Sequence, residues 1–311
     1  MTLDDGRETD AQKVARLREL IPATSAGIYL DTAYRGPLPA ETAAAMRDAE
    51  DWELRVGRAT EGRAEDLEQR RNEARAVIAA LIGADPDEVR FTPFLDLIAT
   101  PTPHVHPDSG ALLAPEKPED GWLALDCSLS AGAVKIDVAT LDADFVVIPG
   151  DRWLLGPEGM RAVWVGPRPR ESDVDLPEPE VGRTQLLGLA RSVGWLEMYV
   201  GLPWIYERTA SLAHHLRESL RVINGVDLLT PESIAATISF RLPAWPTDQL
   251  LDELRRRVFA IVGATPNGKA VRASVAWFNT EDEIDRFVSA VAEIAQHTPE
   301  TLPRKKTLEV L

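Results

Sequence analysis

Apolar residues recur every three or four positions in several stretches of the chain, the spacing that places them on one face of an α-helix. This spacing predicts a C-terminal helix beginning near Thr280, with Ile284, Phe287 and Val291 on its apolar face. Thr280 and Glu283 also stand at the spacing of a capping box, which marks a helix N-terminus. The same criterion predicts helices over residues 11–21, 41–56, 65–81, 185–200, 203–223 and 247–257.

Shorter apolar runs, bounded by polar or turn residues, predict β-strands between these helices. Three runs follow closely in the middle of the chain, at 122–125, 145–148 and 162–165. Further strands are predicted in "DEVRFTP", "SIAATISFRL", "FAIVG" and "KAVRASVAW". Residues 100–121 are rich in turn-forming residues around one apolar patch, 111–114, so we predict mainly loop there. If that patch and 122–125 form neighbouring strands, the link is too short for a parallel crossover, so they are antiparallel or not joined directly.

The alternation of strands and helices predicts an α/β protein with two domains. We expect residues 46–221 to form the larger sheet domain, shortened around 94–121. Residues 1–45 and 222–311 are expected to come together as a smaller α+β domain built from the two chain ends.

The net charge and the cysteine content argue against some classes of partner and indicate the cellular compartment. The 311 residues carry a formal net charge of −16, a field that disfavours nucleic acid and anionic membranes as partners. No apolar run has the length of a membrane span, and the first twenty residues are charged throughout, so we expect no membrane anchor and no signal peptide. The single cysteine, Cys127, is typical of a reducing compartment. We therefore predict a cytoplasmic protein.

Five stretches together resemble the class V aminotransferases, a branch of the fold-type I pyridoxal-phosphate (PLP) enzymes that includes cysteine desulfurases and isopenicillin-epimerase-like proteins. The resemblance implies a shortened fold-type I large domain with a smaller domain beside it. It covers most of the chain except residues 94–121. In the family's order, the stretches are "IYLDTAYRGPLP", "ALIGADPDEVRFTP", "LALDCSLSAGAVKIDVATLDADFVV", "RWLLGPEGM" and "VRASVAWFNTEDEIDRFV".

The resemblance breaks at the residue that defines the family's chemistry. Aligned on "WLLGPEG", Asp151 stands where the family has a histidine, and Arg152 stands where it has the lysine that forms a Schiff base with PLP. A guanidinium stays protonated at accessible pH and cannot condense with an aldehyde as a neutral amine does. The region between Thr92 and Trp122 also lacks the hydroxyl-rich helix start that would hold the cofactor phosphate. Leu129 replaces an expected glutamine or histidine. From these losses we predict a pseudoenzyme that has no cofactor and does not use PLP.

Several residues remain candidates for the former cofactor cleft. The resemblance places Asp126 where the family's aspartate meets the pyridine nitrogen, and Arg272 where the family grips a substrate carboxylate. Tyr34 and Arg35 would line the same cleft. Asp126, Asp151 and Arg152 are the candidate catalytic residues. Arg152 has two interpretations: a structural partner of Asp126, Asp151 or strand-end carbonyls, which is the preferred one, or a binding site for an anion such as a carboxylate.

Metal and nucleophile chemistry find little support in the sequence. His104 and His106 alternate near Asp108, but no further ligand has recognisable spacing, so no metal site is predicted. Cys127 is expected to be a small buried residue, because no histidine lies near it in sequence. Trp153 is expected to fill the core.

Three functions stay open. The first is a dimeric, non-catalytic subunit, as a homodimer or beside an active paralogue; the apolar stretch "TQLLGLARSVGWLEMYVGLPWI" fits a dimer face. The second is a PLP-independent enzyme acting on a small carboxylate or amino acid, with Arg272 as a clamp and an aspartate supplying any proton transfer. The third is a PLP-dependent lyase or transferase with an unusual mode of cofactor binding.

Overall fold

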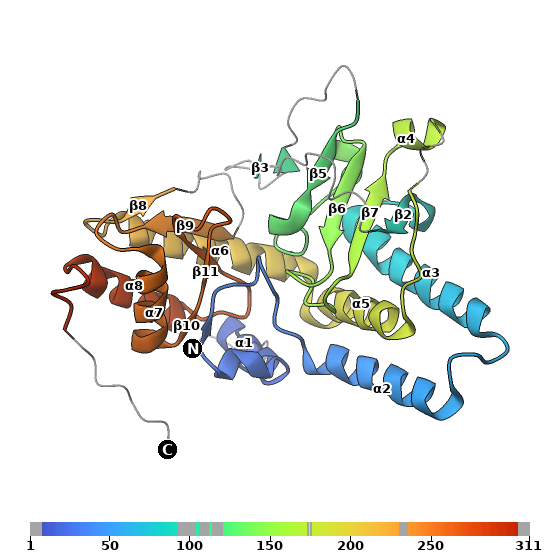
Figure 1. Ribbon diagram of the computed structural model, residues 1–311, viewed down its shortest axis with the longest axis horizontal. Helices are drawn as coiled ribbons and strands as arrows, with labels where there is room; N and C mark the ends of the chain where they lie inside the picture. The colour runs from blue at the N-terminus through green and yellow to red at the C-terminus, as the bar shows by residue number, and fades with distance from the viewer. Residues whose placement is uncertain are drawn as a thin grey trace, which may run out of the picture.

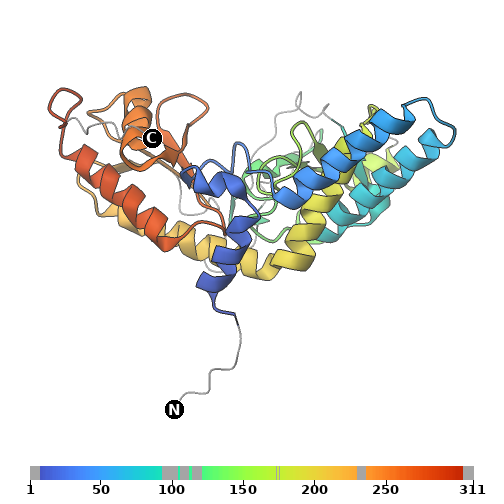
Figure 2. The same cartoon turned by 90° about the horizontal axis from the view of Figure 1, so that it is seen from below.

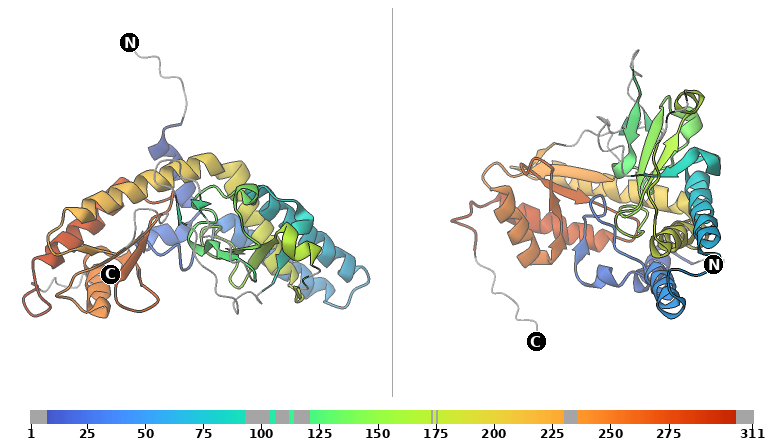
Figure 3. Two further views of the ribbon diagram at one scale, coloured as in Figure 1. Left: turned by 90° about the horizontal axis from the view of Figure 1, so that it is seen from above. Right: turned by 45° about the vertical axis from the view of Figure 1, so that its right-hand side comes forward.

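The computed structural model describes residues 8–92, 104–105, 112–113, 121–172, 174, 176–229 and 236–303. Its elements form two lobes, each built around a β-sheet, and Figure 1 shows the lobes side by side. Long helices line the outside of both lobes (Figure 2). Helix α6 (Leu202–Arg221) runs from the larger lobe across to the smaller one, as the left view of Figure 3 shows.

The sheet of the larger lobe has four strands in the order β2-β7-β6-β5. Strand β5 pairs parallel with β6, whereas β6 with β7 and β7 with β2 are antiparallel. Asp126 is the last residue of β5, so its side chain lies at the carboxyl end of a parallel pair, where α/β proteins place ligands. The strands are β2 (Val89–Phe91), β5 (Ala124–Asp126), β6 (Phe145–Pro149) and β7 (Arg161–Val165).

Both faces of this sheet are covered, which is why its central strand β6 is apolar at every position. On one face, Val146 and Ile148 join the main core together with residues of α3 (Arg63–Ile82) and α5 (Arg183–Trp195). On the other face, Phe145 and Val147 form a smaller cluster, covered by the chain that follows the short helix α4 (Pro167–Glu171). Helix α2 (Ala40–Val56) packs on α5.

The smaller lobe contains an antiparallel sheet in the order β11-β12-β9-β8. Helices α6, α7 (Thr247–Val258) and α8 (Glu281–Ala295) pack around it. Thr280 caps α8, and its capping box with Glu283 is formed as the sequence predicts. The strands are β8 (Asp227–Leu228), β9 (Thr237–Arg241), β11 (Gly263–Ala264) and β12 (Val271–Ser274).

The N-terminal segment joins the smaller lobe. After α1 (Asp10–Glu19), β1 (Ile28–Tyr29) pairs parallel with β10 (Ala260–Ile261). The chain continues along β12, because Asp31 forms a bridge with Ser274. This parallel pairing brings Asp31, near the start of the chain, beside Arg272 on β12.

The predicted elements are found at their predicted places, with differences at their ends. The helix predicted over 185–200 changes after Trp195 into a π-helical turn, Leu196–Val200, and Gly201 at φ 95° separates it from α6. The strand predicted at 122–125 is shifted to 124–126, because those residues pair with β6. The patch at 111–114 contributes β4 (Leu112–Leu113), which pairs antiparallel with β3 (His104–Val105) and not with β5.

Within the described residues, no helix combines the length and the apolar character needed to cross a membrane.

Candidate ligand-binding site

The loop that carries Arg152 is held in one shape by short backbone hydrogen bonds. Gly150 donates to the carbonyl of Met160 at 2.8 Å, and Gly156 donates back to Gly150 at 2.7 Å. Leu155 closes a turn by donating to the carbonyl of Arg152 at 3.0 Å. Leu155 is fully buried and left-handed, with φ at 54°. This conformation is unfavourable for a residue with a side chain, so the surrounding packing must enforce it.

A second loop crosses the first at Gly36. Gly36 donates to the carbonyl of Asp151 at 2.8 Å. A Cβ atom at this position would lie 2.0 Å from the carbonyl oxygen of Arg152, so only glycine permits the crossing. Arg35, the residue before Gly36, forms an ion pair with Asp151, with 3.1 Å between Nη1 and Oδ2. The family-like motifs "AYRGP" and "DRWLLG" are therefore in direct contact.

A cleft of about 560 Å³ lies between the two lobes, at the carboxyl end of β5. This volume is within the range of small-molecule sites. The larger lobe contributes Asp126, Ser128, Leu129 and Arg152; the remainder of the lining comes from the N-terminal segment and the small sheet, namely Asp31, Ala33, Tyr34, Thr237, Ser239, Gly263, Ala264, Thr265, Pro266 and Arg272.

Arg152 enters this cleft without a partner. Its side chain makes no hydrogen bond and no ion pair with any residue that the structure describes, and its Nε atom is buried and unbonded. Burial lowers the pKa of Arg152; nearby Asp126 and Asp151 oppose this change, and the positive charges of Arg161 and Arg272 add to it. The preferred sequence interpretation, a salt bridge filling the site, is therefore wrong within the described chain.

The two carboxylates that were expected to pair with Arg152 have other partners. Asp126 accepts hydrogen bonds from the backbone N–H of Ser128 at 3.0 Å and from the Ser128 hydroxyl, because it caps the 3₁₀ turn Cys127–Leu129. Asp151 is buried and pairs with Arg35. The sequence predicted that Arg152, Asp126 and Asp151 lie near one another, but it did not reveal which charges would pair.

Arg272, in contrast, has a carboxylate partner. Its Nη2 atom donates to Oδ1 of Asp31 at 2.9 Å, and both side chains are mostly buried, with exposed fractions of 13% and 18%. Gly263 leaves room for the pair, since a Cβ there would lie 2.9 Å from Asp31. Burial raises the pKa of Asp31, and the hydrogen bond and charge of Arg272 oppose that shift. Asp31 lines the cleft but was not among the predicted site residues; its place at the end of "IYLD" was the available signal.

Tyr34 lies between two cations at the edge of the cleft. The guanidinium carbon of Arg35 is 5.0 Å from the Tyr34 ring centroid, and that of Arg272 is 5.3 Å away. These are cation–π distances. Half of Tyr34 remains exposed. Tyr34 thus contacts both Arg35 and Arg272. Of the three residues predicted to line the cleft from the small domain, Tyr34 and Arg272 are in its lining, whereas Arg35 is not and pairs with Asp151.

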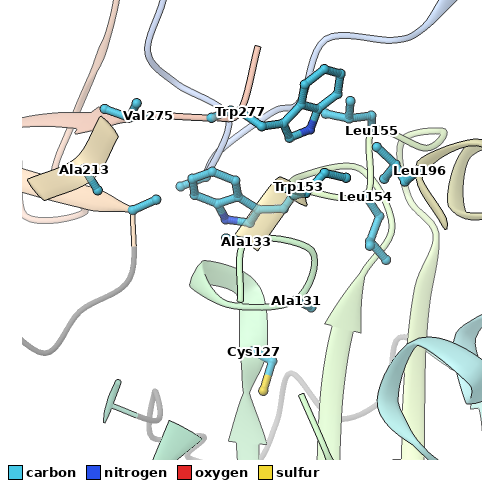
Figure 4. Packing of buried hydrophobic residues seen from close by; sticks show 14 of the residues in the cluster. Cys127, Ala131, Ala133, Trp153, Leu154, Leu155, Leu196, Ala213, Val275 and Trp277 are labelled. Atoms are coloured by element: carbon cyan, nitrogen blue, oxygen red, sulfur yellow. The ribbon is translucent and has the colours of Figure 1, made fainter. Parts of the chain in front are cut away.

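The remaining candidates are structural or outside the described residues. Cys127 is fully buried, and burial raises its pKa, so it is a poor nucleophile. Trp153 fills the core, as predicted, and Figure 4 shows it with Trp277 and Leu155 where the lobes meet. His106 and Asp108 lie outside the described residues. Among the described residues, no cluster of ligating side chains suits a metal ion.

Comparison with known proteins places this geometry in context. No protein-family model matches the sequence. Isopenicillin N epimerase of Streptomyces clavuligerus is 27% identical over 206 residues, which cover 54% of this chain and 51% of the epimerase. A probable cysteine desulfurase of Xylella fastidiosa (strain 9a5c) is 26% identical over 212 residues, covering 55% of this chain and 49% of that protein. Each match thus spans about half the length of these curated relatives.

Solved structures match over much more of the chain. A cysteine desulfurase from Thermococcus onnurineus NA1 superposes with a TM-score of 0.73 at 18% identity, over 91% of this chain and 98% of that one. The chain has the fold of the PLP-dependent cysteine desulfurases. A cystine C–S lyase in complex with its product, cysteine persulfide, superposes with a TM-score of 0.72 at 12% identity, over 90% and 100% of the two chains. The resemblance to class V aminotransferases seen in the motifs is therefore confirmed, as is the α/β fold.

These comparisons correct the expectation that PLP has no part in this protein. A variant of the C–S lyase that shares the fold, with a TM-score of 0.71 at 14% identity, carries glycine covalently linked to the PLP cofactor. The physical reason for the error is that losing one lysine removes a covalent bond but leaves the cleft. Asp126 still stands at the end of β5, and two guanidinium groups face the same space.

The described residues fit PLP in one respect and not in another. Asp126 offers a carboxylate for a protonated ring nitrogen, and Arg152 and Arg272 offer positive charge for an anionic group. None of the described residues that line the cleft is a lysine. The described part of the lining therefore suits non-covalent binding of the cofactor and supplies no amine for covalent attachment.

Proposed function

We propose that this protein is a non-catalytic, class V aminotransferase-like binding protein, whose cleft holds a small anionic ligand by ion pairing and not by a covalent bond. The observation that carries this proposal is Arg152, an unpaired guanidinium in the cleft, on the loop where the resemblance expects the lysine. A partly buried charge without a partner costs free energy, and a bound anion would reduce that cost.

PLP is the first ligand to test, because neighbours of the same fold use it. When bound, PLP supplies an electron-withdrawing ring and an aldehyde. On this chain, Asp126 would face the ring nitrogen, and Arg152 would contribute only charge and hydrogen bonds. Because the Arg152 guanidinium keeps its proton, it cannot attack the aldehyde, and PLP would remain exchangeable.

The test is borohydride reduction after incubation with PLP. Wild-type protein is mixed with PLP, passed through a desalting column to remove loosely held PLP, reduced with borohydride and analysed by intact mass. We expect the mass of wild-type protein to be unchanged. Arg152→Lys is the matched variant, because it restores an amine on the same loop; we expect it to gain a pyridoxyl group and a visible absorption band before reduction.

A second candidate keeps PLP-dependent catalysis with an unusual attachment, and the PLP-bearing neighbour favours it. The same experiment separates the two candidates. A pyridoxyl group on wild-type protein, mapped by peptide sequencing to a lysine, would overturn the non-catalytic proposal and identify the attachment site.

We also propose that the protein works as a dimer or beside a related subunit. Large apolar side chains are exposed along α2 and the π-helical turn, with Leu54 and Met198 each 84% exposed. Met198 lines a groove together with residues of α2 and α5. Such surfaces mark protein contacts. Light scattering during gel filtration tests this: we expect a dimer for wild-type protein and a monomer for Met198→Asp. A monomeric wild-type protein would leave only the partner-subunit form of the proposal, and failure to co-purify a related chain would end that form.

A further inference from the structure

Arg152 is a charged side chain of the cleft lining whose guanidinium has no ion-pair partner among the described residues. Four charged groups act on it electrostatically: Asp126 and Asp151 attract it, while Arg161 and Arg272 repel it. Neither aspartate is within ion-pair distance, because one caps a turn and the other binds Arg35. Arg272 is itself paired with Asp31. A negatively charged group of a ligand would therefore find Arg152 available for direct pairing.

The guanidinium is also attached to a rigid support. The carbonyl of Arg152 accepts a hydrogen bond from the backbone N–H of Leu155, and the loop around Gly36 packs closely against the same carbonyl. Leu155 is held in the left-handed region although it is fully buried. A strained conformation of this kind persists only where the surrounding packing enforces it, and it is common at ligand sites. A fixed loop loses less conformational entropy on binding than a mobile one.

The rest of the cleft lining is largely apolar. Ala33, Tyr34, Leu129, Ala264 and Pro266 all contribute to it. Leu129 is notable because it follows Asp126 closely and replaces the polar residue that the resemblance implies. These side chains provide an apolar surface for the body of a ligand, whereas the planar fork of a guanidinium matches a carboxylate in shape and charge.

We propose that Arg152 binds the carboxylate of a small monocarboxylic acid whose apolar body lies against Tyr34 and Leu129. This deepens the proposed function by naming the ligand class of the same cleft, and it rests on that function only through the shared cleft. Arg272 plays the lesser role, since Asp31 already neutralises it.

Calorimetric titration in the absence of PLP tests the proposal. Benzoate and isovalerate are the probes; acetate lacks the apolar body, benzamide lacks the charge, and inorganic phosphate carries the charge without the body. We expect benzoate and isovalerate to bind more tightly than acetate and phosphate, and benzamide to give no measurable heat. We expect Arg152→Met to weaken benzoate binding about tenfold or more, and Leu129→Gln to weaken it less.

Two controls keep the result interpretable. Arg286→Ala removes an exposed guanidinium on α8 that is not part of the cleft lining, and it should leave benzoate binding unchanged. Arg152→Gln serves beside Arg152→Met, with the fold of each variant checked by its unfolding midpoint. Equal benzoate affinity in wild type and in both Arg152 variants, preferential binding of phosphate, or no carboxylate binding at all would overturn the proposal. Because PLP is absent, each of these outcomes is distinct from the borohydride result.

Discussion

Arg18 and Arg152 show two different uses of a partly buried arginine in one chain. The guanidinium of Arg18 donates to the carbonyl of Phe278 at 2.8 Å and to that of Thr24 at 3.0 Å. It also forms an ion pair with Glu283 at 2.7 Å. The guanidinium of Arg152 makes no hydrogen bond or ion pair with the described residues. The first arginine holds α1 against α8, whereas the second is attached to a loop and reaches into a cleft.

Structural arginines differ from ligand-binding ones in how far the fold already satisfies their hydrogen bonds. Arg208 repeats the first pattern, because it donates to the carbonyls of Trp277 and Asn279 and pairs with Glu281. Arg257 does the same, with Glu253, Glu293 and the carbonyl of Pro303 as partners. Folding satisfies these arginines completely, as buried charges require. Arg152 departs from this pattern, so its role is sought in binding.

The largest effect on the free energy of unfolding is expected at Arg18, whose charge is paired within the fold. Glu283→Ala removes the carboxylate that pairs with Arg18 and accepts from Thr280 at the start of α8. Because Glu283 is buried, the change leaves an unpaired charge, and we expect the free energy of unfolding to fall by about 3–5 kcal/mol. Urea denaturation measures this. Arg286→Ala, at an exposed pair, should change it by less than about 0.5 kcal/mol. A loss as small at Glu283 would remove the contrast between the two arginines.

The next effect concerns the support beneath Arg152. Gly36→Ala would place a Cβ atom 2.0 Å from the Arg152 carbonyl oxygen, so the two loops must move apart. We expect a loss of about 1–3 kcal/mol, together with weaker benzoate binding. Gly194→Ala is the matched control: its Cβ would meet only Met198, at 3.5 Å, within helix α5, so a gain of up to about 1 kcal/mol is expected. If Gly36→Ala has the same free energy of unfolding as wild type, the loop crossing does not fix the position of Arg152.

A smaller effect, which depends on pH, is expected at Asp31. Burial raises the pKa of Asp31 above its ordinary value, so the folded chain binds this proton more tightly than the unfolded chain. The free energy of unfolding contributed by Asp31 is therefore highest at low pH and falls as pH rises through the raised pKa. Asp31→Asn should remove this slope, at a cost of about 1 kcal/mol, because Arg272 would then donate to a neutral amide oxygen and not to a carboxylate.

Denaturation of wild type and Asp31→Asn across acidic pH provides the measurement. The stability advantage of wild type should shrink as pH increases from the ordinary aspartate pKa upward. An advantage that grows with pH would show that pairing with Arg272, and not burial, controls Asp31.

The smallest effect is expected at Arg152 itself. Arg152→Met replaces an unpaired, half-buried cation with an apolar side chain of similar length. Because no ion pair with the described residues is lost, we expect the free energy of unfolding to change by less than about 1 kcal/mol, with a gain the more natural direction. Thermal and urea unfolding without ligand provide the readout. A loss comparable to that of Glu283→Ala would make Arg152 a structural arginine like Arg18.

Local sequence patterns were sufficient for most of the secondary structure. The capping box at Thr280 and the glycine that ends α3 at Gly83 act within a few residues, so they are visible in the sequence. The exact extent of β5 was not, because pairing with β6 selects the residues that join the sheet. The π-helical turn after Trp195 was likewise missed, since it continues the apolar pattern of α5 and differs only in its hydrogen bonds.

The residue types at the site follow from motifs that are continuous in the chain: an arginine in the loop after β6, an aspartate at the end of β5 and an arginine on β12. Which of these charges pair depends on how distant segments fold together. Asp31 and Arg272 are 241 positions apart and meet because β1 leads the chain along β12. Asp151 is taken by Arg35 from the crossing loop, which leaves Arg152 unpaired, because ion pairing acts over a few ångströms and depends on chain geometry more than on sequence distance.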